Sequence, residues 1–357
     1  MPAKIAPGPV IFTKSAGVTL DSRSLIPRAW GEAPPGHDIR AFNPAVVRFR
    51  DRLLMAYRVD LASPGRILPR IAVCTLDDSL QVAPDSVCSF SDTVQVGGTS
   101  FQDPRFLVYR ERLFVHYNDG CMTSPNRIYL VEVDPDTLAA RSPARELRLL
   151  GQRQFVEKNW MLFEHDGELL AVYQIAPHTI LHVDLSRAGP IGCTPAYSST
   201  WDTSAYRKCF GPLRGGAPPV RQGDTYVSFF HSAQPLSRLH WLLHHWPLAP
   251  GARLPHFVAA RLWRLRRPLA QACYYAGIYT FAATPPYRPL WLCPEPVLRP
   301  EDEEPRVLPR LNPRERGVVY PCGAVPCDDG SWLVSYGVHD ERCCLRRIAL
   351  PVLGQNV

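Results

Sequence analysis

A hairpin motif that recurs along the chain constrains its fold more than any other feature. Phe49–Tyr57 (FRDRLLMAY) lines up with Tyr109–Tyr117 (YRERLFVHY) sixty positions later. Looser copies end at Tyr173, Phe230 and Tyr336 (HDGELLAVY, QGDTYVSFF, DDGSWLVSY). Each copy reads as a strand, a polar turn of two to three residues and a second strand with alternating side chains, which is typical of a β-hairpin. The closing aromatic residues are 60, 56, 57 and 106 positions apart.

Further strands are expected after the hairpins, over 70–76, 127–133, 179–185, 274–281 and 343–350. Four short strands at a period near 57 predict one propeller blade per repeat. The sequence therefore predicts a single all-β domain over 1–357, a five-bladed β-propeller with four antiparallel strands in each blade. The long last interval predicts an insertion, 233–273, within the fourth blade. The blades span roughly 40–95, 96–152, 153–205, 206–300 and 315–350, and the stretch 11–20 is expected to supply the strand that closes the ring.

Proline content supports an architecture of short strands. The chain has 37 prolines in 357 residues, about twice the usual share. Because proline breaks helix interiors and the middles of strands, a coiled coil, a helical solenoid and a doubly wound sheet all fit this composition poorly. The 46% of hydrophobic residues is enough to build a substantial core.

Charge and cysteine usage narrow the class of protein further. The net charge of +7 suits an anionic small ligand and is too dispersed to indicate nucleic-acid binding. No window approaches the roughly 18 uninterrupted apolar residues of a membrane span, and the first ten residues lack the apolar stretch of a secretory signal. We therefore expect a soluble, cytoplasmic protein. The eleven scattered cysteines contain no CxxC pair and indicate reduced thiols rather than disulfides or a zinc site.

Short polar signatures accompany the hairpins, one set per repeat. They are Phe42–Ala45 (FNPA), Gln102–Arg105 (QDPR), Glu157–Trp160 (EKNW), Arg214–Pro218 (RGGAP) and Tyr320–Gly323 (YPCG). Strand ends add Tyr57-Arg58, His116–Asn118, Phe230–Ser232 and Tyr336–Asp340. In a propeller the inner ends of the blades line a central funnel, so these side chains are expected to converge there.

This series resembles glycoside hydrolase family 130, the five-bladed propellers that include β-mannoside phosphorylases. It is also similar to the related β-1,2-mannosyltransferases that share the same propeller. The resemblance runs from about residue 40 to 350 and is strongest at FNPA, at DPR and in the last blade, VVYPCGAV…DDGSWLVSYGVHD. It implies a carbohydrate-active enzyme that performs an inverting transfer of a β-linked sugar, usually mannose. No cofactor or metal is expected.

The resemblance assigns roles to individual residues. Asp103 corresponds to the family's general acid, and its place before an inner strand lets its carboxyl group point into the funnel; a raised pKa would suit this role. The alternative is that Asp103-Pro104 only makes a turn. Candidates for holding phosphate or a phosphate-bearing donor are Arg58, Lys158, His231, Tyr275 (or its neighbour Tyr274) and Arg105, of which Arg105, like Arg214, could instead form a structural ion pair. Asn43, Asn159, Asp340 and His178 are candidates for sugar binding, and Trp160 or Tyr57 for stacking on a pyranose; Trp160 could equally be core and His178 a satisfied histidine at a strand end.

Departures from the family pattern leave the reaction type open. Gln102 replaces the usual glutamate, Tyr173–His178 replaces a His-Arg-Pro signature, and Phe230–Ser232 stands where Tyr-His-Gly is expected. One phosphate-binding arginine of the family is therefore missing. The partners considered are a sugar substrate with inorganic phosphate, a sugar phosphate or a nucleotide-sugar donor. Hydrolysis would need a second carboxylate as base, from Glu157 or Asp340. A non-catalytic, glycan-binding propeller and a homo-oligomer also stay open.

Other patterns favour structural roles. His240 and His244 have the spacing of a helical metal pair but lack the glutamate of a zinc protease, so a surface position is expected. Asp134–Asp136 (DPD) is expected to form a turn rather than a metal motif. The basic stretch Arg261–Arg267 is expected at a solvated edge of the insertion, and the acidic run Glu301–Glu304 in a loop between blades.

Overall fold

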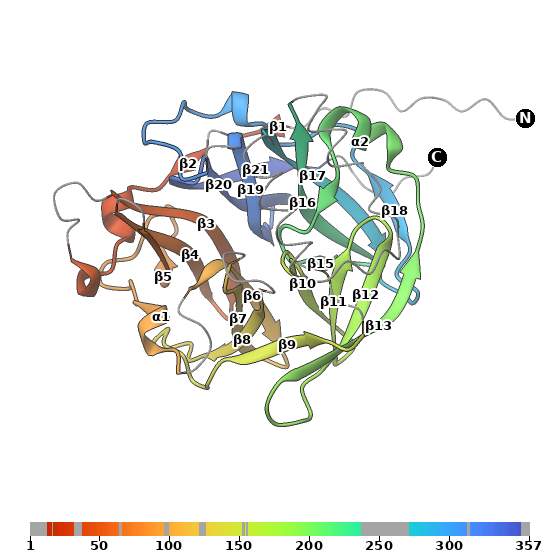
Figure 1. Ribbon diagram of the computed structural model, residues 1–357, viewed down its shortest axis with the longest axis horizontal. Coiled ribbons are helices and arrows are strands. Elements are labelled where there is room, and N and C mark those ends of the chain that lie inside the picture. The colour runs from red at the N-terminus through yellow and green to blue at the C-terminus, as the bar shows by residue number, and fades with distance from the viewer. Residues whose placement is uncertain are drawn as a thin grey trace, which may run out of the picture.

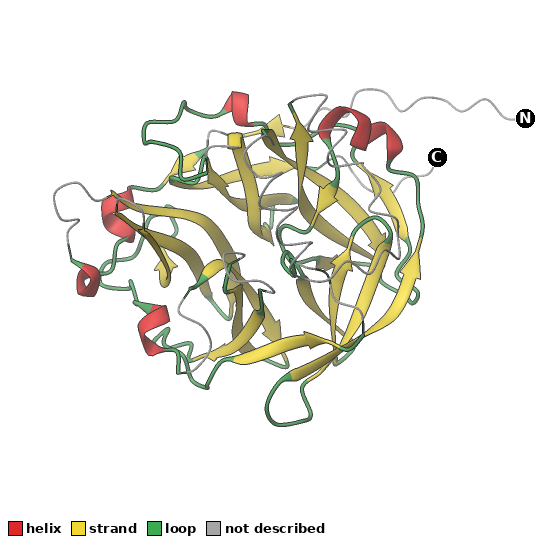
Figure 2. Cartoon of the chain, in the orientation of Figure 1, coloured by secondary structure: helices red, strands yellow, loops and turns green. Residues whose placement is uncertain are grey.

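The structure is a computed structural model that describes residues 13–15, 17–31, 38–63, 66–95, 100–120, 126–151, 154, 156–236, 271–312 and 315–350. The chain is all-β, as the sequence predicts. The described helical segments are short: η1 (Ser22–Leu25), η2 (Arg28–Trp30), α1 (Phe90–Thr93), α2 (Ser204–Phe210) and η4 (Pro300–Asp302). Figure 2 shows them at the periphery, outside the strands.

The described strands form sheets of three, eight and ten strands. Within them, antiparallel groups follow one another along the chain around a common centre (Figure 1), and short parallel pairings join the second group to the third and the fourth to the fifth. The first group contains β3 (Asp38–Phe49), β4 (Arg52–Ser63) and β5 (Arg66–Leu76). The second contains β6 (Gln102–Tyr109), β7 (Arg112–Asn118), β8 (Ile128–Val133) and β9 (Arg145–Leu149). The third contains β10 (Met161–His165), β11 (Glu168–Gln174), β12 (His178–Asp184) and β13 (Ile191–Ser199).

The last two groups involve both ends of the described chain. The fourth contains β14 (Leu213–Arg214), β15 (Val220–Gln222), β16 (Thr225–Pro235), β17 (Ala272–Ala282) and β18 (Pro289–Leu292). The fifth contains β19 (Glu315–Pro326), β20 (Ser331–Val338) and β21 (Arg342–Ala349). The N-terminal strands β1 (Thr13–Lys14) and β2 (Val18–Thr19) pair antiparallel with β21, and both lie within the stretch 11–20 from which the sequence predicts a closing strand.

The hairpin turns explain the repeat that the sequence displays. Phe49 pairs with Arg52, Tyr109 with Arg112, and His165 with Glu168, so each of these turns contains two residues. Both turn residues of the second hairpin, Arg110 and Glu111, have positive φ angles of 49° and 58°. Two positive φ angles match the twist of the flanking strands. The polar pairs that interrupt each apolar run are therefore turn residues.

The first group departs from the predicted four strands. Its fourth position is taken by residues 82–88, which form no continuous strand with β5 but meet it at the isolated bridges Val73–Cys88 and Leu76–Val82 and at hydrogen bonds of Thr75 with Ala83 and Ser86. Pro84 lies within this segment and has no N–H to donate to a strand neighbour. A turn that brings the N–H of Ser86 to the carbonyl of Ala83 then separates the two bridges.

The core lies between neighbouring groups rather than in one central mass. Along β4, Leu54 and Ala56 pack toward the second group, whereas Leu53, Met55 and Tyr57 pack toward the fifth. Because both faces of the strand are buried here, its residues 53–57 form a continuous apolar run. The contact between the first and fifth groups, which includes Leu333 and Leu345 from the fifth, closes the ring.

The insertion begins later than predicted. Ala233–Pro235 and Ala272-Cys273 belong to β16 and β17, which pair along their whole length from Thr225–Ala282 to Pro235–Ala272. Most of the insertion, 237–270, lies outside the described residues, together with His240, His244 and the basic stretch Arg261–Arg267. Among the described helices, none is long and apolar enough to cross a membrane.

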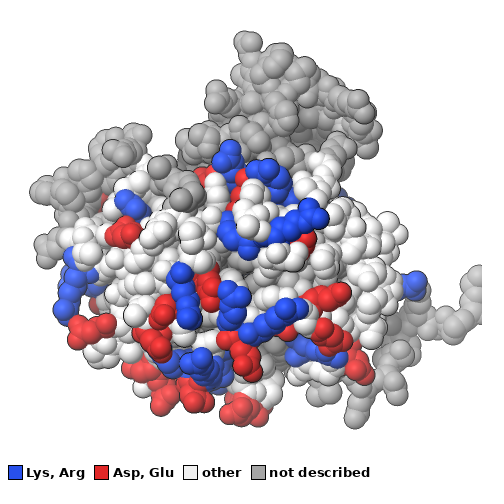
Figure 3. Space-filling model, turned by 90° about the horizontal axis from the view of Figure 1, so that it is seen from below, with Lys and Arg blue, Asp and Glu red and all other residues white. Residues whose placement is uncertain are grey.

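Charges of both signs are interspersed over the described part of the face in Figure 3. The positive net charge is therefore not gathered into one basic patch on this face.

Candidate functional site

Backbone irregularities at the centre of the ring place the polar signatures. Asn43 and Asp103 occupy bulges in β3 and β6, and their φ angles are 54° and 52°. Asn159, just before β10, has a φ angle of 64°. Asparagine and aspartate tolerate this left-handed conformation better than most residues, and bulges re-aim side chains at active sites. The equivalent position in the fourth group is Gly215, where a Cβ would lie 1.9 Å from the carbonyl oxygen of Asn159.

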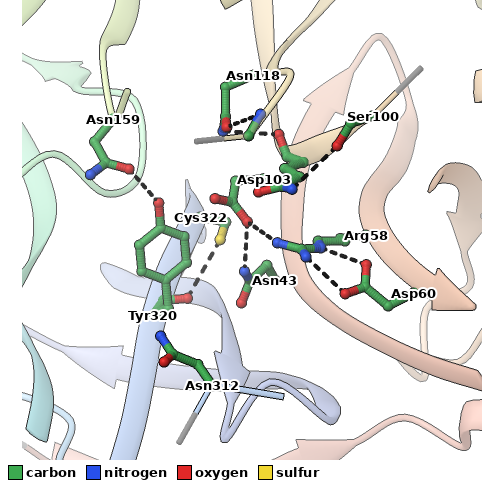
Figure 4. A network of polar contacts seen from close by, with 12 residues as sticks. Asn43, Arg58, Asp60, Ser100, Asp103, Asn118, Asn159, Asn312, Tyr320 and Cys322 are labelled. Atoms are coloured by element: carbon green, nitrogen blue, oxygen red, sulfur yellow. Dashed lines mark hydrogen bonds and ion pairs between the residues drawn. The ribbon is translucent and has the colours of Figure 1, made fainter. Parts of the chain in front are cut away.

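Asp103 lies at the middle of a polar network (Figure 4). Its Oδ1 accepts a hydrogen bond of 2.9 Å from Nδ2 of Asn43 and lies 3.5 Å from Nη1 of Arg58. Arg58 is itself held by Asp60, which accepts from its Nε at 2.6 Å and from its Nη2 at 2.8 Å. The side chain of Asp60 is fully buried, so this pair fixes the direction of the guanidinium. The structure thus brings Asn43, Arg58 and Asp103 together, as the sequence predicts.

The protonation state of Asp103 differs from the expectation. Burial raises its pKa, but the positive charges of Arg58, Lys158 and Arg105 and the hydrogen bond from Asn43 outweigh burial, so the pKa is lowered. The prediction of a raised pKa is wrong for the site without a ligand, because three cations surround this carboxyl group. Asp103 is therefore ionised at neutral pH in this state.

Arg105 has a structural position rather than an open one. It is 2% exposed, and its Nε donates to the carbonyl oxygen of Gly216 at 2.5 Å. Its Nη1 donates to the carbonyl oxygen of Asp103 at 3.4 Å, and its Nη2 donates to the hydroxyl oxygen of Tyr320 at 2.5 Å. Tyr320 in turn donates to Oδ1 of Asn159 at 2.7 Å. Arg105 thus joins the second, fourth and fifth groups, and the expectation that it holds a donor directly is replaced by a role in positioning.

His231 is placed near the site but is not a cation. Burial, followed by the charges of Arg214, Arg105 and Lys158, lowers its pKa well below the ordinary value. Nδ1 of the neutral ring lies 2.9 Å from the carbonyl oxygen of Gly215, so this nitrogen donates and Nε2 is left as an acceptor. A neutral acceptor suits a hydroxyl group better than phosphate, which corrects the predicted role.

Tyr274, rather than Tyr275, accompanies His231. The two rings stack with their centroids 5.9 Å apart, and Tyr274 shares a hydrogen bond with Arg214. Because side chains alternate along β17, Tyr275 faces the other way, against Phe210, and donates to Oε1 of Gln234 at 3.1 Å. The structure thus favours Tyr274 over Tyr275 as the tyrosine beside the site.

Lys158 differs from Arg58 and Arg105 in having no partner among the described side chains. It is half-buried, and in the described residues it takes part in no hydrogen bond or ion pair. Its charge nevertheless lowers the pKa of both Asp103 and His231. It is therefore a cation beside the candidate acid that is available to an anion.

The aromatic and histidine candidates for sugar contact belong to the core. Trp160 is 2% exposed and donates to Oε2 of Glu157 at 3.3 Å. The hydroxyl group of buried Tyr57 donates to the carbonyl oxygen of Leu25 at 2.6 Å. His178 is 1% exposed and packs against Tyr279 and Phe281 between the third and fourth groups, and burial lowers its pKa to about 4. The structure does not bring these three side chains into the network around Asp103.

The two spare carboxyl groups have different environments. Glu157 accepts from the backbone N–H of Gln154 at 2.5 Å, from Tyr173 at 3.3 Å and from Trp160, so it braces the loop before β10. Burial, together with a hydrogen bond to Glu315, raises the pKa of Asp340 well above its ordinary value. Asp340 lies close enough to Arg58 and Asp103 for both charges to affect it.

Several residues of the network were missed by sequence reasoning. Asp60 is two positions after Arg58 on β4, so the two side chains share a face, and this spacing could have revealed the pair. Tyr320 was noted only as part of a signature, because nothing local indicates that its hydroxyl group reaches Arg105 and Asn159. Glu315 meets Asp340 across the ends of β19 and β20, a contact that only the tertiary structure creates.

The motifs set aside as structural meet the expectation only in part where they are described. Oδ1 of Asp134 accepts from the backbone N–H groups of Asp136 and Thr137, both at 3.0 Å, as in a turn. The acidic run is not a simple exposed loop, because Glu301 and Asp302 belong to η4 and the side chain of Glu303, which is 8% exposed, forms an ion pair of 3.0 Å with Arg346. Within the described ranges, no group of three or more histidine, cysteine, aspartate and glutamate side chains is arranged to hold a metal ion.

Comparison with known proteins identifies the fold. No protein-family model and no curated protein matches the sequence. The β-1,2-mannobiose phosphorylase from Listeria innocua, solved with β-1,2-mannobiose, superposes with a TM-score of 0.55 at 14% identity over 93% of this chain and 96% of its own. A mannose phosphorylase from Leishmania mexicana, solved with a phosphate ion, gives a TM-score of 0.54 at 11% identity over 94% and 89%.

A third similar solved structure belongs to glycoside hydrolase family 130. It concerns the glycoside hydrolase family 130 mannoside phosphorylases and members that are glycoside hydrolases targeting β-1,2-mannosidic linkages in Candida mannan. It gives a TM-score of 0.59 at 13% identity over 99% of this chain and 98% of its own. The resemblance predicted from the sequence is thus confirmed for the fold: the chain is built like the mannoside phosphorylases of glycoside hydrolase family 130.

Proposed function

We propose that this chain is an inverting, carbohydrate-active enzyme of the family 130 type that transfers a β-linked mannosyl group, with Asp103 as its general acid. In this proposal residues 1–357 form one five-bladed propeller domain, and the strand groups around the common centre are its blades. The mannoside phosphorylases that share the fold support the substrate class.

The observation that carries the proposal is the environment of Asp103. The carboxyl group sits between an amide donor, Asn43, and a guanidinium, Arg58, where the first strands of the first two groups meet. A general acid must be held in one direction so that its proton meets the leaving oxygen. Phosphate is already a nucleophile, so a phosphorylase needs cations to hold it rather than a second carboxylate to activate water.

Ligand binding would also supply the protonated acid. Asp103 is ionised in the absence of a ligand because Arg58, Lys158 and Arg105 lower its pKa against the effect of burial. An anion bound beside Arg58 and Lys158 would offset these charges, and the pKa of Asp103 would then rise. Phosphate would thus act as the nucleophile and also favour the acid form of its catalytic partner.

The remaining polar groups divide by charge. Lys158 and Arg58, with Arg214 and the hydroxyl group of Tyr274, are proposed to hold phosphate or the phosphoryl group of a donor. Asn43, Asp340 and the neutral ring of His231 are proposed to bind sugar hydroxyl groups. This division follows from which groups are cationic and which can accept a hydrogen bond.

Hydrolysis is less well supported. Of the two carboxylates that could serve as base, Glu157 already accepts hydrogen bonds from Gln154 and Trp160 in the loop before β10 and from Tyr173 in β11. Asp340 is buried and hydrogen-bonded to Glu315, and both effects raise its pKa, so its carboxyl group is already engaged by a second carboxyl group. A non-catalytic glycan-binding propeller would not require an acid surrounded by cations.

A synthesis assay tests the proposal. Mannose 1-phosphate and GDP-mannose would be offered separately over a panel of mannoside acceptors, with the wild type and with Asp103→Asn. Phosphate release from mannose 1-phosphate that disappears in Asp103→Asn is the expected result. Transfer only from GDP-mannose would place the protein among transferases, and equal rates in the variant would refute the role of Asp103.

A further inference from the structure

A buried chain of hydrogen bonds leads from Arg105 to the candidate site. Arg105 donates from Nη2 to the hydroxyl oxygen of Tyr320. Tyr320 in turn donates to Oδ1 of Asn159 (Figure 4). Arg105 is 2% exposed and Tyr320 is 7% exposed, so water does not compete for these bonds. The three residues belong to the second, fifth and third groups, so that only the closed ring assembles them.

The donor-to-acceptor direction of these hydrogen bonds follows from the chemistry of the groups. A guanidinium has donors and no acceptor, so the oxygen of Tyr320 must accept from Arg105. The single hydroxyl proton of Tyr320 is then left for Asn159, which must present its amide oxygen to receive it. The amino group of Asn159 is therefore directed away from Tyr320, as Figure 4 shows. Within the described part of the chain, this amino group has no hydrogen-bond acceptor.

The surroundings of Asn159 define what the amino group can bind. Asn159 is half-buried, and the preceding residue, Lys158, is a cation that affects both Asp103 and His231. Both side chains can then only donate toward a ligand. A subsite with donors and a positive charge selects an oxygen that carries negative charge over a hydroxyl group that must also donate.

We infer that Tyr320 is a positioning residue that fixes Asn159 as a hydrogen-bond donor, so that Asn159 and Lys158 form a subsite for a phosphoryl oxygen. This rests on the proposed function and deepens it, since it assigns Asn159 to the phosphate and not to the sugar. Inorganic phosphate and the phosphoryl group of a sugar phosphate share this chemistry.

The test is a binding measurement with a double-mutant cycle. Inorganic phosphate and mannose 1-phosphate are titrated by calorimetry into the wild type, Tyr320→Phe, Asn159→Ala and the double variant. Each single substitution is expected to weaken phosphate binding by about tenfold or more, since a hydrogen bond to a charged group is involved. The double variant is expected to bind no more weakly than Asn159→Ala, because Tyr320 acts through Asn159. If only mannose 1-phosphate shows the effect, the subsite serves the sugar phosphate; if both do, it serves either source.

Two further variants separate positioning from loss of folding. Tyr57→Phe also removes a buried tyrosine hydroxyl group, at a site outside the network, and is expected to leave phosphate affinity unchanged. Asn159→Asp cannot donate, so it is expected to bind phosphate less tightly than Asn159→Ala. This variant tests the inference even if Tyr320→Phe fails to fold.

The outcomes are distinguishable from those of the proposed function. Wild-type phosphate affinity in Tyr320→Phe, effects that multiply in the double variant, or a wild type that binds neither ligand would each overturn the inference. Turnover that requires Asp103, with phosphate affinity independent of Tyr320, would sustain the function and remove the inference. Absence of turnover with every donor, together with phosphate affinity that depends on Tyr320, would sustain the inference and remove the proposed function.

Discussion

Replacing Gly337 by alanine should disturb the candidate acid without touching it. Gly337 lies in β20 and packs directly against Asn43, whose amide donates to Asp103. A Cβ at position 337 would lie 2.1 Å from Oδ1 of Asn43 and 2.8 Å from its backbone nitrogen. The backbone of Gly337 is not in the left-handed region, so the expected effect is one of space and not of conformational strain.

The geometry gives the size of the effect. Ordinary contact begins near 3.4 Å, so the amide oxygen must move by about 1.3 Å from the 2.1 Å position. A shift of this size breaks the 2.9 Å hydrogen bond between Asn43 and Asp103. A hydrogen bond to a charged group contributes about 1.5–3 kcal/mol, which corresponds to a loss in kcat/KM of roughly 10- to 150-fold. Overpacking should also lower the free energy of unfolding by about 1–3 kcal/mol.

The assay compares kcat/KM and the free energy of unfolding in Gly337→Ala and in a matched control. Gly317→Ala is the control. Gly317 lies in β19, in the same group of strands as Gly337, and its Cβ would lie 2.8 Å from Pro300 and not against Asn43. The control should lose stability and keep its kcat/KM. If Gly337→Ala folds and retains wild-type kcat/KM, the hydrogen bond from Asn43 does not position the acid, and the reasoning is refuted.

Three other substitutions test separate parts of the structure. Asp60→Asn removes a buried partner of Arg58 and should lower the free energy of unfolding by about 3–5 kcal/mol, measured by denaturant titration; a loss below 1 kcal/mol would contradict the buried pair. His178 has its pKa lowered by burial to about 4, so the unfolded chain binds a proton that the folded chain does not as pH falls from 6.5 toward 4. The contribution of His178 to the free energy of unfolding should therefore be fully present above pH 6.5 and fall by about 3 kcal/mol between pH 6.5 and 4. His178→Gln should flatten the plot of unfolding free energy against pH in this range, and an unchanged slope would contradict the burial of a neutral His178. Glu157→Gln should lower the melting temperature but leave turnover within about threefold, since Glu157 braces a loop, whereas loss of turnover in a correctly folded variant would reopen hydrolysis.

Much of the fold could be predicted because hairpins are local. The turns at Arg110-Glu111 and Asp166-Gly167 connect strands that pair at once, so pairing and register follow from short stretches of sequence. The weaker predictions involve residues outside a hairpin. Tyr274 and Tyr275 are neighbours in one predicted strand, and only the pairing of β16 with β17 decides which ring faces His231.

The site divides in the same way. The polar signatures and their spacing place Asn43, Asp103 and Asn159 at equivalent positions of successive repeats, and this much is a property of the sequence. The charge state of Asp103 is not, because it depends on Arg58, Lys158 and Arg105 meeting across the first three groups. Neither is the neutrality of His231 nor the direction of the Asn159 amide. Sequence alone determined the hairpins and the polar signatures that recur with them, since strand pairing across a short turn is local. Only ring closure decided which of these side chains reach the centre and what each one meets there, since burial and charge depend on distances between groups far apart in the chain.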